Sequence, residues 1–342
     1  MKAKILALLR ERKTYVSGQQ LCEQFGVSRT AVWKAIEQLR EDGHQIDAVP
    51  RKGYLLTEGP GTDVTGEIYT QSEISSRMQT RWAGKKVYFY DSVGSTNVQA
   101  RRLAEEGAPH GSLIVTDMQT AGRGRRGRSW SSPAGTNLYF TLLLRPGFHP
   151  SKASMLTLVM AHAVAAAIEE TANAETAGMG ETGLAVGIKW PNDIVIQGKK
   201  VCGILTEMSV EQDDIRHVVI GAGINVRRQD FGPELAQKAI CLDEACGGRV
   251  NRCRLLAAVM QAFERDYEAF EAAGSLMPLR ASYDGRLVNL GREVCVLDPA
   301  GEYRGVARGI TDTGELLVER SDGTIQKVFA GEVSVRGIYG YV

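Results

Sequence analysis

The feature that most constrains how this chain can fold is a break in its pattern at residues 57–66, TEGPGTDVTG, which are rich in glycine, threonine and proline. This composition is typical of a linker and disfavours helix and strand interiors. The chain has 342 residues, enough for two or three domains. We therefore expect separate folding units at 1–62, 66–283 and 286–342.

Residues 1–62 have the order of elements of a winged helix-turn-helix. A first amphipathic helix precedes a short helix at 18–25, and Ser28 is expected to cap a further helix that ends near Glu41. Two strand-like pieces, HQIDAV and GYLL, would form the wing. The residues predicted to contact DNA, near the start of the last helix and at the wing tip, are Ser28, Arg29, Thr30, Lys34, Arg51 and Lys52. The alternative is a small helical bundle without a role on DNA.

Between residues 66 and 283 strands and helices alternate, with two hairpin-like stretches at 185–208 and 214–226. This predicts an α/β or α+β domain with a mainly mixed or antiparallel sheet. From residue 286 the pattern consists of strands alone, broken by short turns, which predicts a small β-barrel. The whole chain is thus expected to be an α+β multidomain protein. The expected strands lie at 85–93, 112–119 and 137–146, and the expected helices at 95–107, 155–172 and 253–273.

Charge and cysteine content exclude several classes of protein. The net charge of +1 excludes a general polycation, so any binding to nucleic acid must use a local patch. We expect no N-terminal leader, and no apolar run comes near the roughly 18 residues of a membrane span, so we expect a cytoplasmic protein that does not bind membranes. The six cysteines include no CxxC pair, which favours reduced thiols and no metal site. A zinc site on Cys241, Cys246 and Cys253 is the disfavoured alternative.

The run GRGRRGR at 122–128 raises a separate question. It fits the GxGxxG pattern of dinucleotide-binding loops, but a strand follows it where a helix is needed, and it lacks the Gly-Lys-Ser/Thr end of a P-loop. A solvated turn and a basic nucleic-acid patch are also open. A loop that folds over an anionic ligand fits the residues better. Glycines let backbone N–H groups approach such a ligand, and guanidinium groups neutralise phosphate and carboxylate.

The motifs GRGRRGRSW, KWPND, GKKVCGIL and GAGINV occur in this order. Together with the expected winged helix and barrel, they make the chain resemble the biotin–protein ligase family, in its bifunctional bacterial form, over nearly its whole length. The resemblance implies a central domain related to class II aminoacyl-tRNA synthetases and an SH3-like barrel at the C-terminus.

The resemblance also implies a two-step reaction. Biotin and ATP, with Mg²⁺, form biotinyl-5′-AMP and pyrophosphate, and a lysine of a biotin carboxyl carrier protein then takes the biotin. It further implies a repressor of biotin genes, which binds operator DNA as a homodimer promoted by biotinyl-5′-AMP.

The residues of these sites are implied by the same motifs. The implied biotin site consists of Ser95, Thr96, Asn97, Gln119, Arg123, Gly124, Arg125 and Lys200. The implied ATP site consists of Arg128, Trp130, Asn192 and Asn225. The implied catalytic residues are Lys200, Arg125, Lys189 and Asp193, of which Asp193 would orient or deprotonate the acceptor lysine. On the residues alone, the alternative role for Ser95 and Thr96 is to cap a helix, which is compatible with ligand binding, and the alternative role for Asp193 is to cap a turn.

Three alternatives stay open, one of which is a ligase whose N-terminal domain is vestigial. A lipoate or octanoyl ligase shares the implied fold but does not need the polar set at 95–97. A repressor that senses biotin without ligase activity does not need the arginines of the loop together with Lys200.

Overall fold

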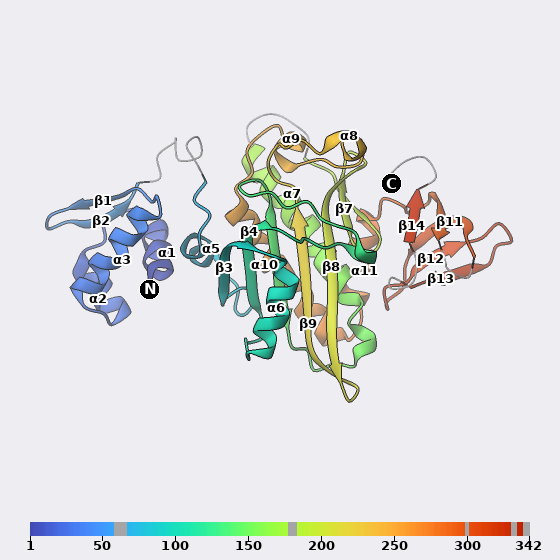
Figure 1. Ribbon diagram of the computed structural model, residues 1–342, viewed down its shortest axis with the longest axis horizontal. Coiled ribbons are helices and arrows are strands. Elements are labelled where there is room, and N and C mark those ends of the chain that lie inside the picture. The colour runs from blue at the N-terminus through green and yellow to red at the C-terminus, as the bar shows by residue number, and fades with distance from the viewer. Residues whose placement is uncertain (58–66, 177–182, 298–300, 330–333, 338–342) are drawn as a thin grey trace. The chain divides into compact units, whose positions relative to one another are not determined.

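The computed structural model divides into two compact units, Met1–Gln79 and Thr80–Val342 (Figure 1). The residues that the structure describes are 1–57, 67–176, 183–297, 301–329 and 334–337.

The first unit confirms the predicted order of helices and wing. Its elements are α1 (Lys2–Arg12), α2 (Gly18–Phe25), α3 (Arg29–Glu41), β1 (Ile46–Val49), β2 (Gly53–Leu56) and α5 (Gln71–Arg77). Apolar side chains of α1, α2 and α3 form its core. Ser28 caps α3 as predicted, since its Oγ accepts a hydrogen bond from the Ala31 N–H at 3.2 Å. Gly53 begins the second wing strand at φ +111°, where a Cβ would stand 2.1 Å from the Val16 carbonyl oxygen. Only glycine fits there.

Helix α5 follows the linker in sequence, yet it packs on α1 in the first unit. Glu73 of α5 is 3% exposed, and it accepts hydrogen bonds from Arg10 at 2.8 Å and from Arg77. Burial alone would raise the pKa of Glu73, but Arg77 and Arg10 outweigh it and hold this pKa below its usual value. Ser72 adds a hydrogen bond to Asp42 at 2.9 Å. The unit therefore extends past the expected boundary near residue 62.

The second unit is centred on a seven-stranded sheet with the order β3-β4-β5-β9-β8-β7-β6. Only β3 and β4 are parallel, which confirms the predicted mixed sheet. The strands are β3 (Val87–Val93), β4 (Ser112–Gln119), β5 (Leu138–Leu144), β6 (Val186–Lys189), β7 (Asp193–Ile196), β8 (Lys199–Glu211) and β9 (Asp214–Ile224). The long β8–β9 hairpin extends well past the shorter β6 and β7 (Figure 1).

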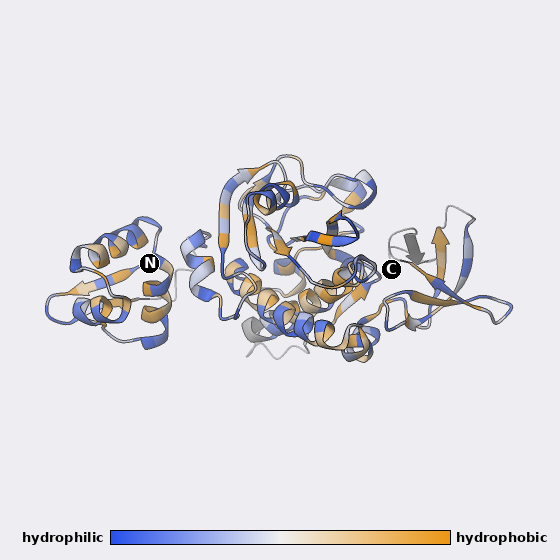
Figure 2. Cartoon of the chain, turned by 90° about the horizontal axis from the view of Figure 1, so that it is seen from below, coloured by the Kyte–Doolittle hydropathy of each residue, from blue (hydrophilic) through white to orange (hydrophobic). Residues whose placement is uncertain are grey.

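Helices lie on both faces of this sheet. Helix α6 packs on β4, β5 and β9, while α7 packs against α10 and β8 in a largely apolar layer (Figure 2). The helices are α6 (Thr96–Glu105), α7 (Met155–Thr176), α8 (Gly232–Leu235), α9 (Leu242–Ala245), α10 (Arg252–Ala273) and α11 (Met277–Arg286). Among the described residues, one helix, Pro150–Asn173, is long and apolar enough to cross a bilayer. Its most apolar window is 72% buried, as in a core helix.

The C-terminal part is an antiparallel sheet with the order β13-β12-β11-β10-β14. The strands are β10 (Glu293–Leu297), β11 (Tyr303–Ile310), β12 (Leu316–Glu319), β13 (Ile325–Val328) and β14 (Ser334–Gly337). The antiparallel strands agree with the predicted small barrel, but the barrel is not closed in the part of the chain described, because β13 and β14 lie at opposite edges and do not pair. Trp190 joins this sheet to the core by donating from Nε1 to the Gly314 carbonyl at 3.0 Å.

Candidate functional site

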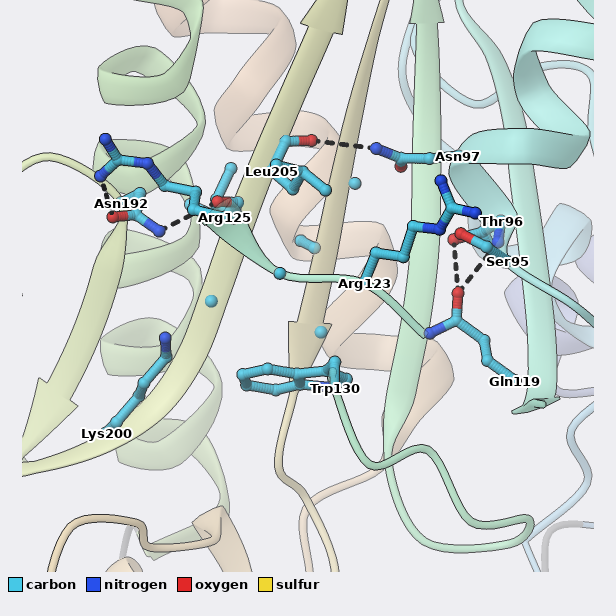
Figure 3. A pocket seen from close by; sticks show the side chains of 16 residues that line it. Ser95, Thr96, Asn97, Gln119, Arg123, Arg125, Trp130, Asn192, Lys200 and Leu205 are labelled. Carbon is cyan, nitrogen blue, oxygen red and sulfur yellow. Dashed lines mark hydrogen bonds between the residues drawn. The ribbon is translucent and has the colours of Figure 1, made fainter. Parts of the chain in front are cut away.

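A hollow lies over β8 and β9, beneath the loop that follows β4 (Figure 3). This loop contains residues 122–128 and is called here the Gly-Arg loop. The hollow is lined by Ser95, Thr96, Asn97, Gln119, Arg123, Gly124, Arg125, Trp130, Asn192, Lys200, Gly203, Ile204, Leu205, Gly221, Ala222 and Gly223. Residues distant in sequence thus meet at one place.

The floor of the hollow has no side chains of its own, because three glycines lie there on the adjacent strands β8 and β9. Gly203 and Gly223 are opposite each other in the β8–β9 register, and Gly221 follows at the next position on the same face. The indole of Trp130 lies against this floor, so that a Cβ at Gly223 would stand 2.5 Å from its Nε1. This Nε1 is buried and has no hydrogen-bond partner among the described residues. A Cβ at Gly221 would collide with Asn97 at 2.1 Å.

One side of the hollow, which we call the polar end, is formed by the start of α6 and the end of β4. The backbone N–H and the hydroxyl of Thr96 both donate to Gln119 Oε1, at 2.9 and 3.2 Å. Gln119 Nε2 in turn donates to Ser132 Oγ at 2.9 Å. Ser95 is the N-cap residue of α6, but its side chain makes no capping hydrogen bond. Its buried hydroxyl therefore remains available to a ligand.

Asn97 completes the polar end but uses its own polar atoms within the protein. Its Nδ2 donates to the Leu205 carbonyl at 3.2 Å and to Glu207 at 2.7 Å. Its Oδ1 accepts from the Thr141 hydroxyl at 2.7 Å. Asn97 thus ties α6 to β5 and β8, and it shapes the hollow through these contacts.

The opposite side, which we call the cationic end, contains two positive groups (Figure 3). Lys200 Nζ forms an ion pair with Asp193 at 2.6 Å and lies 5.2 Å from the centroid of the Trp130 ring. Arg125 donates from Nη1 to Asn192 Oδ1 at 3.0 Å. Burial lowers the pKa of Arg125, and the nearby Asp193 carboxylate opposes this shift. Trp130 separates this end from the polar end.

The Gly-Arg loop is held closed by its own backbone. Gly124 N–H donates to the Arg128 carbonyl at 2.8 Å, and Trp130 N–H donates to the Gly122 carbonyl at 2.9 Å. Arg126 adopts φ 57°, a left-handed conformation that turns the loop. Of the arginines of the loop, Arg123 and Arg125 line the hollow.

The structure brings together most of the predicted ligand-binding residues and leaves others outside. Within the described lining, Lys189, Asp193, Arg128 and Asn225 do not occur. Asp193 reaches the site through its ion pair with Lys200, and Arg128 is exposed on the loop. Lys189 is buried on β6, the edge strand of the sheet. It does not line the hollow, because β7 lies between β6 and β8. Asn225 is also buried and donates to the Ile240 carbonyl at 3.3 Å.

The glycine floor was not predicted as part of the site. Its signal was present, because the GAG of GAGINV places Gly221 and Gly223 two residues apart on a strand. Cys202, next to Gly203, points away into the core, where burial raises the pKa of its thiol.

In the first unit, every residue predicted to contact DNA lies on an exposed surface. Ser28 is the N-cap of α3, and Arg29, Thr30 and Lys34 are exposed on that helix. Arg51 and Lys52 are exposed at the turn between β1 and β2. Arg29 is held by a hydrogen bond to Gln19 of α2 at 3.2 Å.

Three family models match successive parts of the chain. They are an HTH domain at residues 2–55, the Biotin/lipoate A/B protein ligase family at 90–225, and the Biotin protein ligase C terminal domain at 290–336. Fold and site thus define a class, in which a biotin/lipoate ligase domain is combined with an N-terminal helix-turn-helix.

Two curated relatives match nearly the whole chain. The chain is 39% identical to the bifunctional ligase/repressor BirA of Bacillus subtilis, covering 94% of both chains. It is 32% identical to the bifunctional ligase/repressor BirA of Escherichia coli, covering 97% of this chain and 96% of that protein. A solved biotin protein ligase from Aquifex aeolicus, in complex with biotin and ATP, has a TM-score of 0.62 at 30% identity and covers 74% of this chain and 99% of that one. The chain belongs to the family of BirA bifunctional ligase/repressors.

Proposed function

We propose that this protein is a biotin–[biotin carboxyl carrier protein] ligase that acts through biotinyl-5′-AMP and also represses biotin genes in the cytoplasm. The observation that carries the ligase assignment is the order of surfaces in the hollow: a polar end, a flat floor beneath Trp130, and a cationic end. Biotin presents a ureido ring, an apolar chain and a carboxylate in the same order.

The polar end suits the ureido ring. The Ser95 hydroxyl is free of a capping bond, and it can donate to the ureido oxygen or accept from a ureido N–H. Thr96 and Gln119 hold one another and fix the shape of this end, while Asn97 anchors it to the sheet. Arg123 and Gly124 cover the ligand from the loop side.

The cationic end suits the first chemical step, in which two anions must meet. The biotin carboxylate attacks the α-phosphate of ATP, and pyrophosphate leaves. Positive groups placed before the reaction lower its barrier by neutralising this charge. Lys200 would bridge the carboxylate and the α-phosphate, and Arg125, held by Asn192, would contact the phosphate.

ATP enters as its Mg²⁺ complex. Mg²⁺ would be held mainly by the phosphates and by water. Asn192 and Arg128 would contact the phosphates from the rim. Asn225 and Lys189 would act as positioning residues behind the sheet surface.

The second step needs a neutral amine on the carrier. A free lysine is mostly protonated near pH 7 and must lose this proton to attack the mixed anhydride. Asp193 is paired with Lys200 at 2.6 Å in this structure. When Lys200 turns to the adenylate, Asp193 loses that partner and can accept a hydrogen bond from the incoming lysine. The same pair thereby serves both steps in succession.

The ligase assignment is tested by incubating the protein with biotin, ATP, MgCl₂ and an unmodified carrier domain, followed by mass spectrometry of the carrier. We expect one biotin on one lysine, and none when ATP is omitted. Transfer of lipoate but not biotin would overturn the substrate assignment. A protein that binds biotin and DNA but transfers nothing would be a sensor without ligase activity.

The repressor assignment rests on the exposed residues of α3 and the wing. A single winged helix makes few phosphate contacts, so a dimer reading two half-sites should bind much more tightly. A surface for dimerisation is offered by β8, which β7 pairs only from Lys199 to Gly203. Beyond this point its outer edge has no strand partner among the described residues, and Met208 and Val210 are exposed there. Unpaired edges of this kind favour pairing with another chain.

This edge adjoins the Gly-Arg loop, since Arg125, Arg126 and Met208 line one hollow beside it. An adenylate that orders the loop would therefore favour the dimer, and a carrier that docks on the same edge would compete with dimerisation. The test is binding to an operator duplex at fixed salt, with and without biotin plus ATP. Affinity that does not respond to the adenylate would contradict this coupling.

A further inference from the structure

The exposed face of α3 carries a large aromatic side chain. Trp33 is 54% exposed, whereas Trp190 is 2% exposed and the two remaining tryptophans, Trp82 and Trp130, are half-buried. The apolar stripe of the helix faces the core through other residues, so the core does not require a tryptophan at position 33.

The neighbours of Trp33 are polar or charged. Arg29 precedes it by four residues and Thr30 by three, Lys34 follows it, and all three are exposed. A helical side chain leans toward the N-terminus of its helix, so the indole covers the turn that carries Arg29 and Thr30. Trp33 therefore lies within the group of residues assigned to DNA contact.

The charges on the exposed face of α3 indicate which kind of partner covers Trp33. Glu37, one turn after Trp33, is paired with Arg40 at 2.8 Å, which leaves Arg29 and Lys34 to set the sign of the surface beside the indole. A second protein covering Trp33 would have to desolvate both cations. Double-stranded DNA supplies phosphates for them and admits a helix into its major groove.

We propose that Trp33 reads the operator by packing against the 5-methyl group of a thymine in each half-site. The thymine methyl is the apolar group that the major groove presents, so it is the matching surface for an indole on a recognition helix. Arg29 and Lys34 position the helix on the phosphates, and Trp33 adds sequence preference. This inference rests on the proposed function as an operator-binding repressor.

The test uses the full-length protein with biotin and Mg–ATP to select a preferred sequence from random DNA duplexes. Thymines of the selected duplex are then replaced one at a time by uracil, which removes only the methyl group. We expect one position in each half-site to lose about four-fold in affinity, the effect of one buried methyl group. Trp33→Ala should bind that duplex about ten- to a hundred-fold more weakly, and uracil at that position should then have no further effect.

Lys34→Ala serves as the matched comparison on the same helix. It should weaken binding to all duplexes alike and reduce the salt dependence of binding by about two counterions, one for each half-site of the dimer. Trp33→Ala should leave the salt dependence of binding unchanged. Its melting temperature should equal that of the wild type, because the side chain is exposed. Trp33→Phe should give an intermediate loss.

The failure of this inference and of the proposed function are distinguishable. If the wild type selects no sequence, operator binding itself fails. If the wild type selects a sequence but Trp33→Ala binds it equally well, or if uracil weakens both proteins alike at every position, only the role of Trp33 is overturned.

Discussion

Replacing Gly223 by alanine tests whether the bare floor is essential to the site. The new methyl group would stand 2.5 Å from Nε1 and 2.7 Å from Cε2 of Trp130. Ordinary contacts between such atoms are about 3.5–4.0 Å, so the indole must move by about 1 Å. The backbone N–H of Trp130 donates a hydrogen bond to the Gly122 carbonyl at 2.9 Å. A shift of Trp130 is therefore expected to displace the Gly-Arg loop as well.

A displacement of about 1 Å in a positioning group can cost about 10²-fold in rate, or about 2.7 kcal/mol of transition-state stabilisation. We expect this loss in kcat/KM for biotin-dependent exchange of pyrophosphate into ATP. Folding stability should change little. Gly223 is not in the left-handed region, and the buried Nε1 of Trp130 has no hydrogen bond to lose.

The assay compares Gly223→Ala with Gly147→Ala, where the same methyl group would enter open space. The control should retain wild-type exchange and melting. Trp130→Phe removes the ring atoms nearest the new methyl, so it should cost less activity in the Gly223→Ala background than in the wild type. Wild-type exchange in Gly223→Ala would refute the argument that the floor must be bare.

Three further predictions concern the cationic end, the loop and the first unit. Lys200→Ala should lower adenylation about 10²-fold or more while the adjacent Lys199→Ala, outside the hollow, retains it, as measured by pyrophosphate exchange. Arg125→Gly should release biotinyl-5′-AMP early, so that bystander lysines are biotinylated, and an unchanged adenylate off-rate would contradict this. In acid the first unit should lose stability in two ranges: below about pH 6.5, because burial lowers the pKa of His44, and below about pH 4.5, because Glu73 loses the ion pairs that lower its pKa. Thermal melting measured from pH 7 to 3 should show a smaller loss of stability below about pH 4.5 in Glu73→Gln than in the wild type.

Elements with a strong local pattern could be predicted from the sequence. The strand at 112–119 and the helix at 18–25 occur as expected, because their patterns reflect burial on one face or in the core. Helix α5 was missed because QSEISSR has no apolar stripe, and two of its buried side chains, Ser72 and Glu73, are polar. Its place depends on partners far away in sequence, such as Arg10 and Asp42.

The sequence also did not indicate that the barrel would stay open between β13 and β14. Whether the two edge strands of a sheet pair with each other depends on contacts between residues distant in sequence. The sequence of β13 does not indicate a partner strand, and its apolar Ile325 is 58% exposed.

The site shows the same division between local and long-range information. Motifs located the residues of the polar and cationic ends, because those motifs carry chemistry. They did not indicate that Lys189 would be held two strands away from Lys200, nor that Asp193 would be paired with Lys200 at 2.6 Å. Both facts follow from the register of β6, β7 and β8, which sequence spacing does not determine.

The central claim, that one hollow makes an adenylate which serves both transfer and repression, is tested most directly in a single turnover. The protein is loaded with biotin and Mg–ATP, freed of excess substrate, bound to its selected duplex and mixed with unmodified carrier domain. We predict one biotinyl-5′-AMP per chain, converted to AMP and biotinylated carrier while the duplex is released at the same rate. Absence of bound adenylate, or carrier labelling that leaves the duplex bound, would contradict the account.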